Sequence, residues 1–390
     1  MNSKDLPQDG PAATAPNRYD RMEWAGAFGD LGTLVPFLLA YISLVKVDPF
    51  GVLFAFGVAK IVAGLYYRTP FPVQPMKAVG VIATTQTVQS IVITPAAVAA
   101  AGLATGLFWL LLGLTGASRR VVRLITRPVA VGIILGLGFG FMLDGMRMMA
   151  SNWLLGGVGL AGTVLLLSSR RVPAMLLLLL FGVAVAAWQD PRLLQELAAI
   201  RPEFRLPGFA LAELRWSDVA IGVLFLALPQ LPLTLGNAIV AVTHENNREF
   251  PHRPVTERKV SISTGLMNLF GATVGGVPMC HGAGGMAGHV RFGARTGGAL
   301  VILGTFILFI ALFFSGSVTT IFKVFPQAVL GVTLFLAGVQ LALGAAEFGK
   351  DRSEHFVVLA TAGFAAWNVG LAFVAGLGLH YAIRRGWLRT

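Results

Sequence analysis

Two short segments of this chain place proline, glycine and an ionisable side chain inside otherwise apolar sequence. Residues 69–78 contain three prolines and Lys77, and residues 277–286 contain Pro278, His281 and three glycines. Proline removes a backbone donor and drives the preceding residue into extended geometry, so each segment predicts an extended stretch followed by a new helix. Such breaks at corresponding places in two halves of a membrane protein indicate a transport site.

The chemistry that these segments favour is the binding of an anion. A helix that begins inside the bilayer exposes amide N–H groups that have no intrahelical partner. Each helix N-terminus carries roughly half a positive charge, so two that converge present about one. A protonated Lys77 adds a full positive charge, and the total of about two matches a doubly negative oxyanion. Gly282, Gly284 and Gly285 leave room for a ligand or a facing helix to approach the backbone.

Several of these residues also have purely structural interpretations. Lys77 either attracts the substrate, which we favour, or forms a buried ion pair with a carboxylate such as Asp30. Lys60 lies in a segment without a break, which favours a structural or snorkelling lysine. His281 either carries a coupled proton or is a hydrogen-bonded polar residue, which is the more common case. Cys280 is the only cysteine; it favours apolar packing and excludes both an intrachain disulfide and a Cys-rich metal site.

Further polar side chains lie within apolar spans of the two halves. Polar residues inside a membrane are expected to serve a functional site or to hydrogen-bond to a neighbouring helix, and the sequence leaves both alternatives open for each one. The residues concerned are Asp30 and Thr33 in the first half and Gln230, Thr234 and Asn237 in the second.

Composition indicates an all-α polytopic membrane protein. Hydrophobic residues make up 55% of the chain and charged residues only 12%, and the apolar runs approach the length of a spanning helix. Runs of this length exclude a porin-like barrel, whose strands have about ten residues. The net charge of +12 is scattered through short loops, so it does not indicate a nucleic-acid partner. No pair of nucleophile and base is apparent, so an enzyme is not expected, and neither a metal site nor a cofactor is predicted.

Hydropathy predicts about fourteen helical segments. In the first half they are 24–45, 50–67, 72–92, 95–117, 124–144, 154–168 and 172–188. In the second half they are 217–242, 258–275, 278–292, 297–315, 323–344, 354–370 and 371–385.

This pattern divides the chain into two halves and three polar regions. We predict a cytoplasmic N-terminal tail at 1–23, a first repeat at 24–188, an extracytoplasmic connector at 189–216, a second repeat at 217–385 and a cytoplasmic tail at 386–390. Most of the 30 Lys and Arg residues fall on the side of the N-terminus, which predicts that both termini are cytoplasmic. Residues 1–23 lack the apolar region of a secretory signal peptide.

Seven helices in each half predict an inverted repeat. Because seven is odd, the second half must cross the membrane in the opposite sense to the first. Short sequence matches between the halves support this, such as Pro75-Met76 with Pro278-Met279, at offsets of about 200 residues.

The two broken segments carry a specific resemblance to a known family. Residues 64–77 read Gly-Leu-Tyr-Tyr-Arg-Thr-Pro-Phe-Pro-Val-Gln-Pro-Met-Lys, and residues 270–286 read Phe-Gly-Ala-Thr-Val-Gly-Gly-Val-Pro-Met-Cys-His-Gly-Ala-Gly-Gly-Met. Together with residues 291–297, these runs resemble the molybdate transporters related to the sulfate permeases. The helical pattern from about Arg21 to Arg385 also fits that family.

The resemblance implies a seven-plus-seven inverted repeat with a core domain and a gate domain. The third and tenth helices are then half-length, and their N-termini flank the substrate. Carried over residue by residue, the resemblance implies these binding residues: Asp30, Thr33, Gln74, Pro75, Met76, Lys77, Gln230, Thr234, Cys280, His281, Gly282 and Ala283. Many sulfate permeases continue into a cytoplasmic regulatory domain, and this chain is expected to lack it.

The sequence therefore predicts a secondary transporter of a bacterial inner (plasma) membrane. Its expected substrate is a tetrahedral oxyanion, molybdate first and sulfate next, and its expected mechanism is alternating access. Asp30 and His281 motivate the hypothesis of proton symport. An anion channel is an alternative that would need a continuous pore. A nucleobase permease of the same architecture is a weaker one, because a neutral base does not require Lys77. Partners other than the anion, the proton and the lipid bilayer are open, including a second copy in a homodimer.

Overall fold

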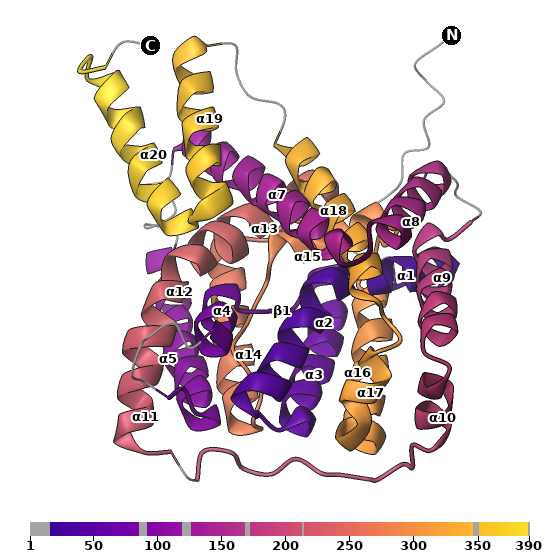
Figure 1. The fold of residues 1–390 in the computed structure, drawn as a ribbon. Coiled ribbons are helices and arrows are strands. Elements are labelled where there is room, and N and C mark those ends of the chain that lie inside the picture. The colour runs from indigo at the N-terminus through magenta and orange to yellow at the C-terminus, as the bar shows by residue number, and fades with distance from the viewer. Residues whose placement is uncertain are drawn as a thin grey trace.

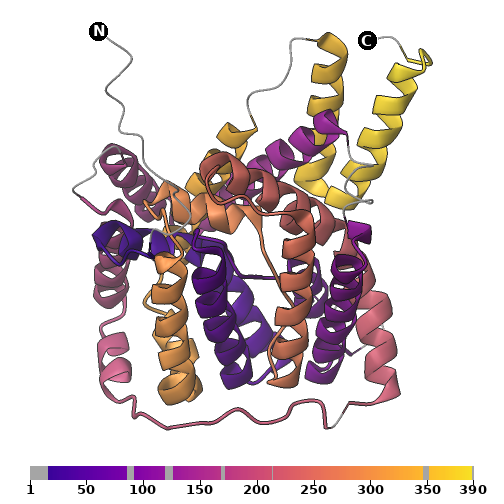
Figure 2. The ribbon, with the colours of Figure 1, turned by 180° about the vertical axis from the view of Figure 1, so that it is seen from behind.

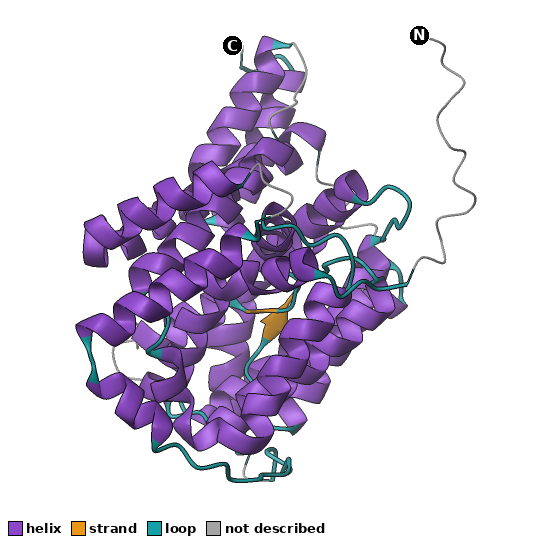
Figure 3. Cartoon of the chain, turned by 90° about the vertical axis from the view of Figure 1, so that its right-hand side faces the viewer, coloured by secondary structure: helices purple, strands orange, loops and turns teal. Residues whose placement is uncertain are grey.

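A computed structural model of the chain describes residues 16–85, 92–118, 126–167, 172–212, 214–345 and 351–388. Within these ranges the chain is almost entirely helical, and the strands are two short ones at its centre (Figure 3). Residues 1–15 of the predicted N-terminal tail and residues 389–390 of the C-terminal tail lie outside the described residues.

The first half contains seven of the predicted segments. Its first segment is continuous through α1 (Arg21–Ala27), a 3₁₀ turn (Phe28–Asp30), α2 (Leu31–Ala40) and a π-helical turn (Tyr41–Val45). The following elements are α3 (Pro49–Tyr67), β1 (Gln74–Pro75), α4 (Lys77–Thr85), α5 (Pro95–Leu114), α7 (Arg127–Met149), α8 (Trp153–Leu166), α9 (Ala174–Gln189) and α10 (Arg192–Ala198).

The second half contains the other seven. Its first segment is continuous through α11 (Trp216–Ile221), η5 (Gly222–Ala227), α12 (Leu228–Leu233), η6 (Thr234–Ala241) and α13 (Val242–Glu249), of which η5 and η6 are π-helical. The following elements are α14 (Glu257–Thr273), β2 (Met279–Cys280), α15 (Ala283–Arg291), α16 (Gly298–Phe314), α17 (Val318–Phe322), α18 (Gln327–Gly344), α19 (Arg352–Trp367) and α20 (Val369–Arg384).

The predicted fold class is confirmed, since each of the fourteen predicted segments contains one of these helices. Two segments differ in detail, because residues 72–76 and 278–282 precede their helices as extended chain and short strands. The prolines explain this difference. The short helices α10 and α17 were not predicted.

Side-chain caps fix where several helices begin. The carboxylate of Asp48 accepts a hydrogen bond from Phe50 N at 3.1 Å, with Pro49 at the first helical position of α3. The hydroxyl of Thr94 accepts from Ala97 N at 3.0 Å at the start of α5. Both caps satisfy amides that have no intrahelical partner, so these starts are encoded locally in the sequence.

Six helical spans among the described residues are long and apolar enough to cross a membrane. They are Arg21–Val45, Pro49–Tyr67, Pro95–Leu114, Arg127–Leu166, Trp216–Glu249 and Gly298–Phe322. This finding agrees with a membrane-spanning chain.

The helices form two groups. In the core group, α3 packs on α16 and α5 packs on α14, around α2, α4, α12 and α15. In the gate group, α7 packs on α18 and α19, α19 packs on α20, and α8 packs on α9 and α18. Figures 1 and 2 show α7, α18, α19 and α20 on one side of the molecule, above α3, α5, α14 and α16.

The packing pairs are consistent with an inverted repeat. A two-fold operation that exchanges the halves exchanges the second helix with the ninth and the fourth with the eleventh. It therefore converts the contact of α3 with α16 into that of α14 with α5, and both contacts are present. The same operation converts the contact of α7 with α19 into that of α18 with α8, and this pair is present too.

Candidate functional site

The two broken segments meet at the centre of the molecule. β1 and β2 pair antiparallel, with Gln74 opposite Cys280 and Pro75 opposite Met279. Met76 N donates to the carbonyl oxygen of Pro278 at 2.8 Å. Because the strands are antiparallel and each leads into a helix, α4 and α15 begin at opposite ends of this short ladder. Figure 3 shows the two strands at the centre of the molecule.

Neither segment is an unbroken helix, as the sequence predicts. α15 has nine residues, and α4 also has nine in its described part. At a rise of about 1.5 Å per residue, nine residues span roughly 13 Å, less than half of the ~30 Å hydrocarbon core. In the part of the chain that the structure describes, both helices are therefore too short to cross the membrane.

Two amide side chains cap the starts of these half-length helices. The side-chain oxygen of Gln230 accepts from Ala78 N at 2.8 Å and from Val79 N at 3.3 Å. The side-chain oxygen of Asn237 accepts from Ala283 N at 3.1 Å. The sequence predicts that the first amide N–H groups of these helices bind an anion. In this conformation the N–H groups of Ala78, Val79 and Ala283 donate to protein side chains instead, so these three donors have partners.

The capping residues come from adjoining α-helical and π-helical parts of the eighth segment. Gln230 follows Pro229 in α12, and Thr234 and Asn237 lie in η6. The amide nitrogen of Gln230 donates to the hydroxyl of Thr234 at 2.9 Å, which fixes the orientation of the cap. π-helical turns are rare and are frequent at functional sites, and here η6 contains Asn237, which caps α15, and Thr234, which orients the Gln230 cap of α4.

A buried ion pair lies beside the strands. Lys60 Nζ is 3.5 Å from Asp30 Oδ2 and donates to the carbonyl oxygen of Val73 at 2.7 Å. Asp30 Oδ1 accepts from the hydroxyl of Thr33 and from Gln74 Nε2. Both charged side chains are fully buried, so a separated charge would be strongly unfavourable there.

This pair settles two alternatives that the sequence leaves open. The lysine that pairs with Asp30 is Lys60, so Lys77 is not the structural partner of that carboxylate. Lys60 has the predicted structural role, and because it is fully buried it does not snorkel.

Lys77 instead meets an aromatic ring of the gate group. Its Nζ lies 3.3 Å from the centroid of the Phe141 ring, which is a cation–π contact. A side chain added at Gly284 would collide with the same ring. Phe141 of α7 therefore fills the space between the start of α4 and the start of α15, and it is only 4% exposed.

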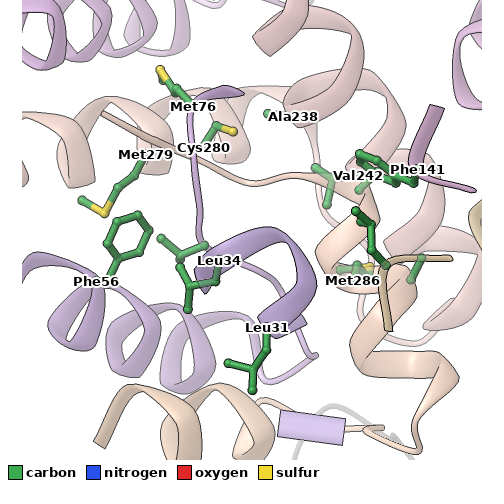
Figure 4. Close-up of a cluster of buried hydrophobic side chains, with 14 of the residues drawn as sticks. Leu31, Leu34, Phe56, Met76, Phe141, Ala238, Val242, Met279, Cys280 and Met286 are labelled. Atoms are coloured by element: carbon green, nitrogen blue, oxygen red, sulfur yellow. The ribbon is translucent and has the colours of Figure 1, made fainter. Parts of the chain in front are cut away.

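Glycine is required where the two segments come closest. A Cβ at Gly282 would collide with the side-chain oxygen of Gln74, which has no hydrogen-bond partner among the described residues. Met76, Met279 and Cys280 are buried in the surrounding apolar cluster, which Figure 4 shows. Their side chains pack at the crossing, and Cys280 has the predicted apolar environment.

A cavity of about 840 Å³ lies between the core and gate groups. On the core side it is lined by Thr33 and Lys77, and on the gate side by Phe141 and by Asp144 with Arg147. Asp144 and Arg147 form an exposed ion pair at 2.9 Å, so their charges offset each other. The cavity is large enough to hold several water molecules together with an anion.

Of the twelve predicted binding residues, Thr33 and Lys77 line this cavity. Asp30, Gln74, Gln230 and Thr234 are buried behind them in the network described above. The strand residues and the start of α15 lie beside the cavity without lining it: Pro75, Met76, Cys280, His281, Gly282 and Ala283.

His281 faces the opposite side of β2. Its Nδ1 is 2.7 Å from the carbonyl oxygen of Pro72, which can only accept, so Nδ1 donates. Its Nε2 is 2.7 Å from the hydroxyl of Ser263, which donates to a neutral ring. The ring also packs edge-on against Tyr67 and Phe71. His281 thus ties the extended segment before α4 to α14.

Sequence reasoning missed the residues of the gate group. Phe141 follows a long apolar stretch of α7, where one more aromatic residue does not stand out. Asn368 separates α19 from α20 and lines the same cavity, and its side chain caps α20 by accepting from Leu371 N at 2.9 Å. The isolated Asn between two apolar runs was a usable signal for a break at that point.

Comparison with protein families gives a specific match. The profile of the family described as "Molybdate transporter of MFS superfamily" matches the chain twice, at residues 22–141 and 222–341. The two matches begin about 200 residues apart, which agrees with the offset of the short repeats in the sequence.

Curated proteins similar to this chain carry names of the same kind. "Molybdate transporter 2" of Arabidopsis thaliana is 32% identical over 94% of this chain and 88% of its own length. "Molybdate transporter 1" of the same plant is 30% identical over the same shares. "Molybdate transporter 1" of Chlamydomonas reinhardtii is 37% identical over 53% of this chain and 40% of its own.

Solved structures share the fold at low sequence identity. The transmembrane domain of the cyanobacterial bicarbonate transporter BicA has a TM-score of 0.55 at 16% identity, covering 93% of this chain and 99% of that one. Murine Slc26a9, described as an anion transporter in the inward-facing state, has a TM-score of 0.56 at 12% identity, covering 97% of this chain and 70% of that one.

Proposed function

This chain belongs to the molybdate transporter family, and we therefore propose that it carries molybdate across the membrane by alternating access. The observation that carries the proposal is the position of Lys77. Lys77 is the first residue of α4, which follows β1, and it lines the cavity between the two helix groups; the start of α15 follows the paired strand β2. A dianion placed there meets one full positive charge and the positive ends of two helix dipoles.

We place the bound anion between Lys77 and the start of α15. Thr33 lies on the same cavity wall, and its hydroxyl, which donates to Asp30 in this structure, would have to turn away from that carboxylate to donate to an oxyanion oxygen. Gln230 and Asn237 hold the first amides of α4 and α15 in position. They position the two helix ends, and the buried residues Asp30 and Gln74 brace the strand that leads into α4.

Phe141 gives the proposed cycle a gate. With its ring against Lys77 and Gly284, no anion can occupy the space between the two helix starts. Binding therefore requires the ring to withdraw, and the ring belongs to α7 of the gate group. A movement of α7 relative to the core group would both open the site and change the side of the membrane from which it is reached.

Proton symport is the coupling that we propose. Asp30 is the buried carboxylate nearest the site, and its charge is balanced by Lys60. A proton on Asp30 would neutralise the charged partner of Lys60 and weaken the interactions that hold β1 in position. Protonation of Asp30 would in this way affect the anion site. Uptake of molybdate into proteoliposomes should then rise with an inward proton gradient. Equal uptake with and without the gradient would remove this proposal.

We propose the inner (plasma) membrane as the location, with both termini cytoplasmic. Thiol labelling tests this orientation, because the native Cys280 is buried. In whole cells, an impermeant reagent should label Gly208→Cys in the connector and should not label His252→Cys in the loop after α13. The reverse result would show the opposite orientation.

A competition assay tests the proposed function directly. Purified protein in proteoliposomes should take up molybdate with saturable kinetics, and excess molybdate should compete better than excess sulfate. Stronger competition by sulfate would identify a sulfate transporter of the same fold. Non-saturable uptake with single-channel currents would identify an anion channel.

A further inference from the structure

A second cavity, of about 460 Å³, lies between α3 and α14 and is separate from the proposed anion site. Its walls are largely apolar: Val58, Val62, Ile262, Leu266, Met267 and Phe270 line it. Lys259 lines one end, and Ser263 and His281 line its wall nearest β2. We call this cavity the α3–α14 groove.

The groove opens toward the surroundings of the protein. Val62, Tyr66 and Leu266 line it and are each more than half exposed, at 57%, 63% and 55%. Because α3 is long and apolar enough to cross a membrane, exposed apolar side chains such as Val62 and Leu266 suit contact with hydrocarbon. The opening of the groove is therefore suited to a ligand that enters from the bilayer.

The dimensions of the groove fit one leaflet. Lys259 and Phe270 are eleven residues apart on α14, which at about 1.5 Å per residue is roughly 16 Å. This length is about half of the ~30 Å hydrocarbon core. An acyl chain that enters from one membrane surface would therefore end near the far end of the groove.

The charged end of the groove is positive. α3 ends at Tyr67 and is followed by Arg68, and α14 starts at Glu257, so Arg68 and Lys259 lie at the same end of the two helices. Lys259 is exposed, and its ammonium has no ion pair or hydrogen bond to any described residue. Tyr66 and Tyr67 lie at the same end, where tyrosines are typical of the membrane interface.

We propose that the α3–α14 groove binds an anionic phospholipid, with one acyl chain between α3 and α14 and the phosphate at Lys259 and Arg68. The acidic headgroup supplies the charge that complements the two cations. The acyl chain lies along the wall that contains Ser263 and His281. The lipid would therefore contact His281, which hydrogen-bonds to Ser263 of α14 and to Pro72 and so connects α14 to the segment before α4.

Native mass spectrometry of the full chain tests this binding. Detergent-purified protein is mixed with phosphatidylglycerol or with phosphatidylcholine of identical acyl chains, and the bound lipid is counted without any molybdate present. We expect one phosphatidylglycerol to be retained in preference to phosphatidylcholine. Lys259→Gln should weaken the retention of phosphatidylglycerol about fivefold. Lys46→Gln, the same change at an exposed site before α3, is the matched control and should leave it unchanged.

A second variant tests the acyl chain rather than the headgroup. Ala63→Phe puts a ring into the groove from α3 and should remove the retained lipid. Lys259→Gln changes an exposed side chain, so its result stands even if Ala63→Phe fails to fold. Three results would each overturn the proposal. The first is equal retention of the two lipids, and the second is an equal loss of lipid in Lys259→Gln and Lys46→Gln. The third is full retention of lipid by a folded Ala63→Phe protein. Because the readout is bound lipid, the outcome is independent of the proposed transport of molybdate.

Discussion

The substitution Lys77→Met tests the charge at the proposed anion site. Methionine keeps a flexible, apolar side chain of similar length and removes only the ammonium. In the structure this ammonium lies 3.3 Å from the centre of the Phe141 ring and has no carboxylate within ion-pair distance among the described residues. Its removal therefore leaves no buried acid without a partner, so the folded protein should keep its structure.

The expected loss of affinity is the difference between two interactions of Lys77. A hydrogen bond from an ammonium to an anion contributes about 1.5–3 kcal/mol. To form it, the ammonium gives up its contact with the ring of Phe141, which contributes about 1 kcal/mol. The net loss is about 0.5–2 kcal/mol, which corresponds to a roughly 2- to 30-fold higher Kd for molybdate.

Isothermal titration of molybdate into purified protein measures this change. Lys46→Met is the matched control, because Lys46 is an exposed lysine outside the cavity. We expect the control to bind as the wild type does. A Kd for Lys77→Met within twofold of the wild type would refute the argument that this charge holds the anion.

Three further predictions concern the network around the site. Lys60→Met leaves Asp30 buried and unpaired and should lower the free energy of unfolding by about 3–5 kcal/mol. Adding Asp30→Leu to that variant should restore most of this stability in a thermal melt. A double variant that melts as low as the single one would contradict this. Gly284→Ala forces a methyl group against the ring of Phe141 and should lower the melting temperature. Gly162→Ala is the control, because its methyl group meets open space and should not lower it. Equal effects of the two changes would disprove the close contact between Gly284 and Phe141. Phe141→Ala removes the ring that competes with molybdate for the ammonium of Lys77. The Kd for molybdate, measured by titration, should fall about two- to fivefold. Weaker binding would show that the ring holds the anion instead.

The breaks at the centre of the fold could be predicted because they are local. Pro72, Pro75 and Pro278 follow one another closely or lie close to glycines, and each favours extended geometry at the residue before it, so the sequence places the interruptions within a few residues. The apolar runs likewise predict all fourteen segments, since each span requires its own length of apolar sequence.

The partners of the buried polar groups could not be predicted. Lys60 and Lys77 are both candidates for Asp30 in sequence, and only the folded position of Lys60 beside Asp30 decides between them. The same holds for Gln230, whose role as a cap for α4 depends on a contact across about 150 residues.

The gate side of the site was hidden for a different reason. The residues around Phe141 in α7 are mostly glycine and other apolar residues, so the sequence does not distinguish Phe141 from a residue of the hydrophobic core. Its contact with Lys77 arises from the crossing of α7 over the start of α4. Sequence patterns describe one helix at a time, and a site between two helix groups requires their relative position.

A structure with molybdate bound tests the central claim most directly. Molybdenum scatters anomalously, so a crystal grown with molybdate locates the metal atom without assumptions about the protein. The account predicts one anomalous peak between the starts of α4 and α15, with an oxyanion oxygen within hydrogen-bond distance of Lys77 Nζ and the ring of Phe141 withdrawn. A molybdenum peak elsewhere in the chain, with Phe141 still against Lys77, would contradict it.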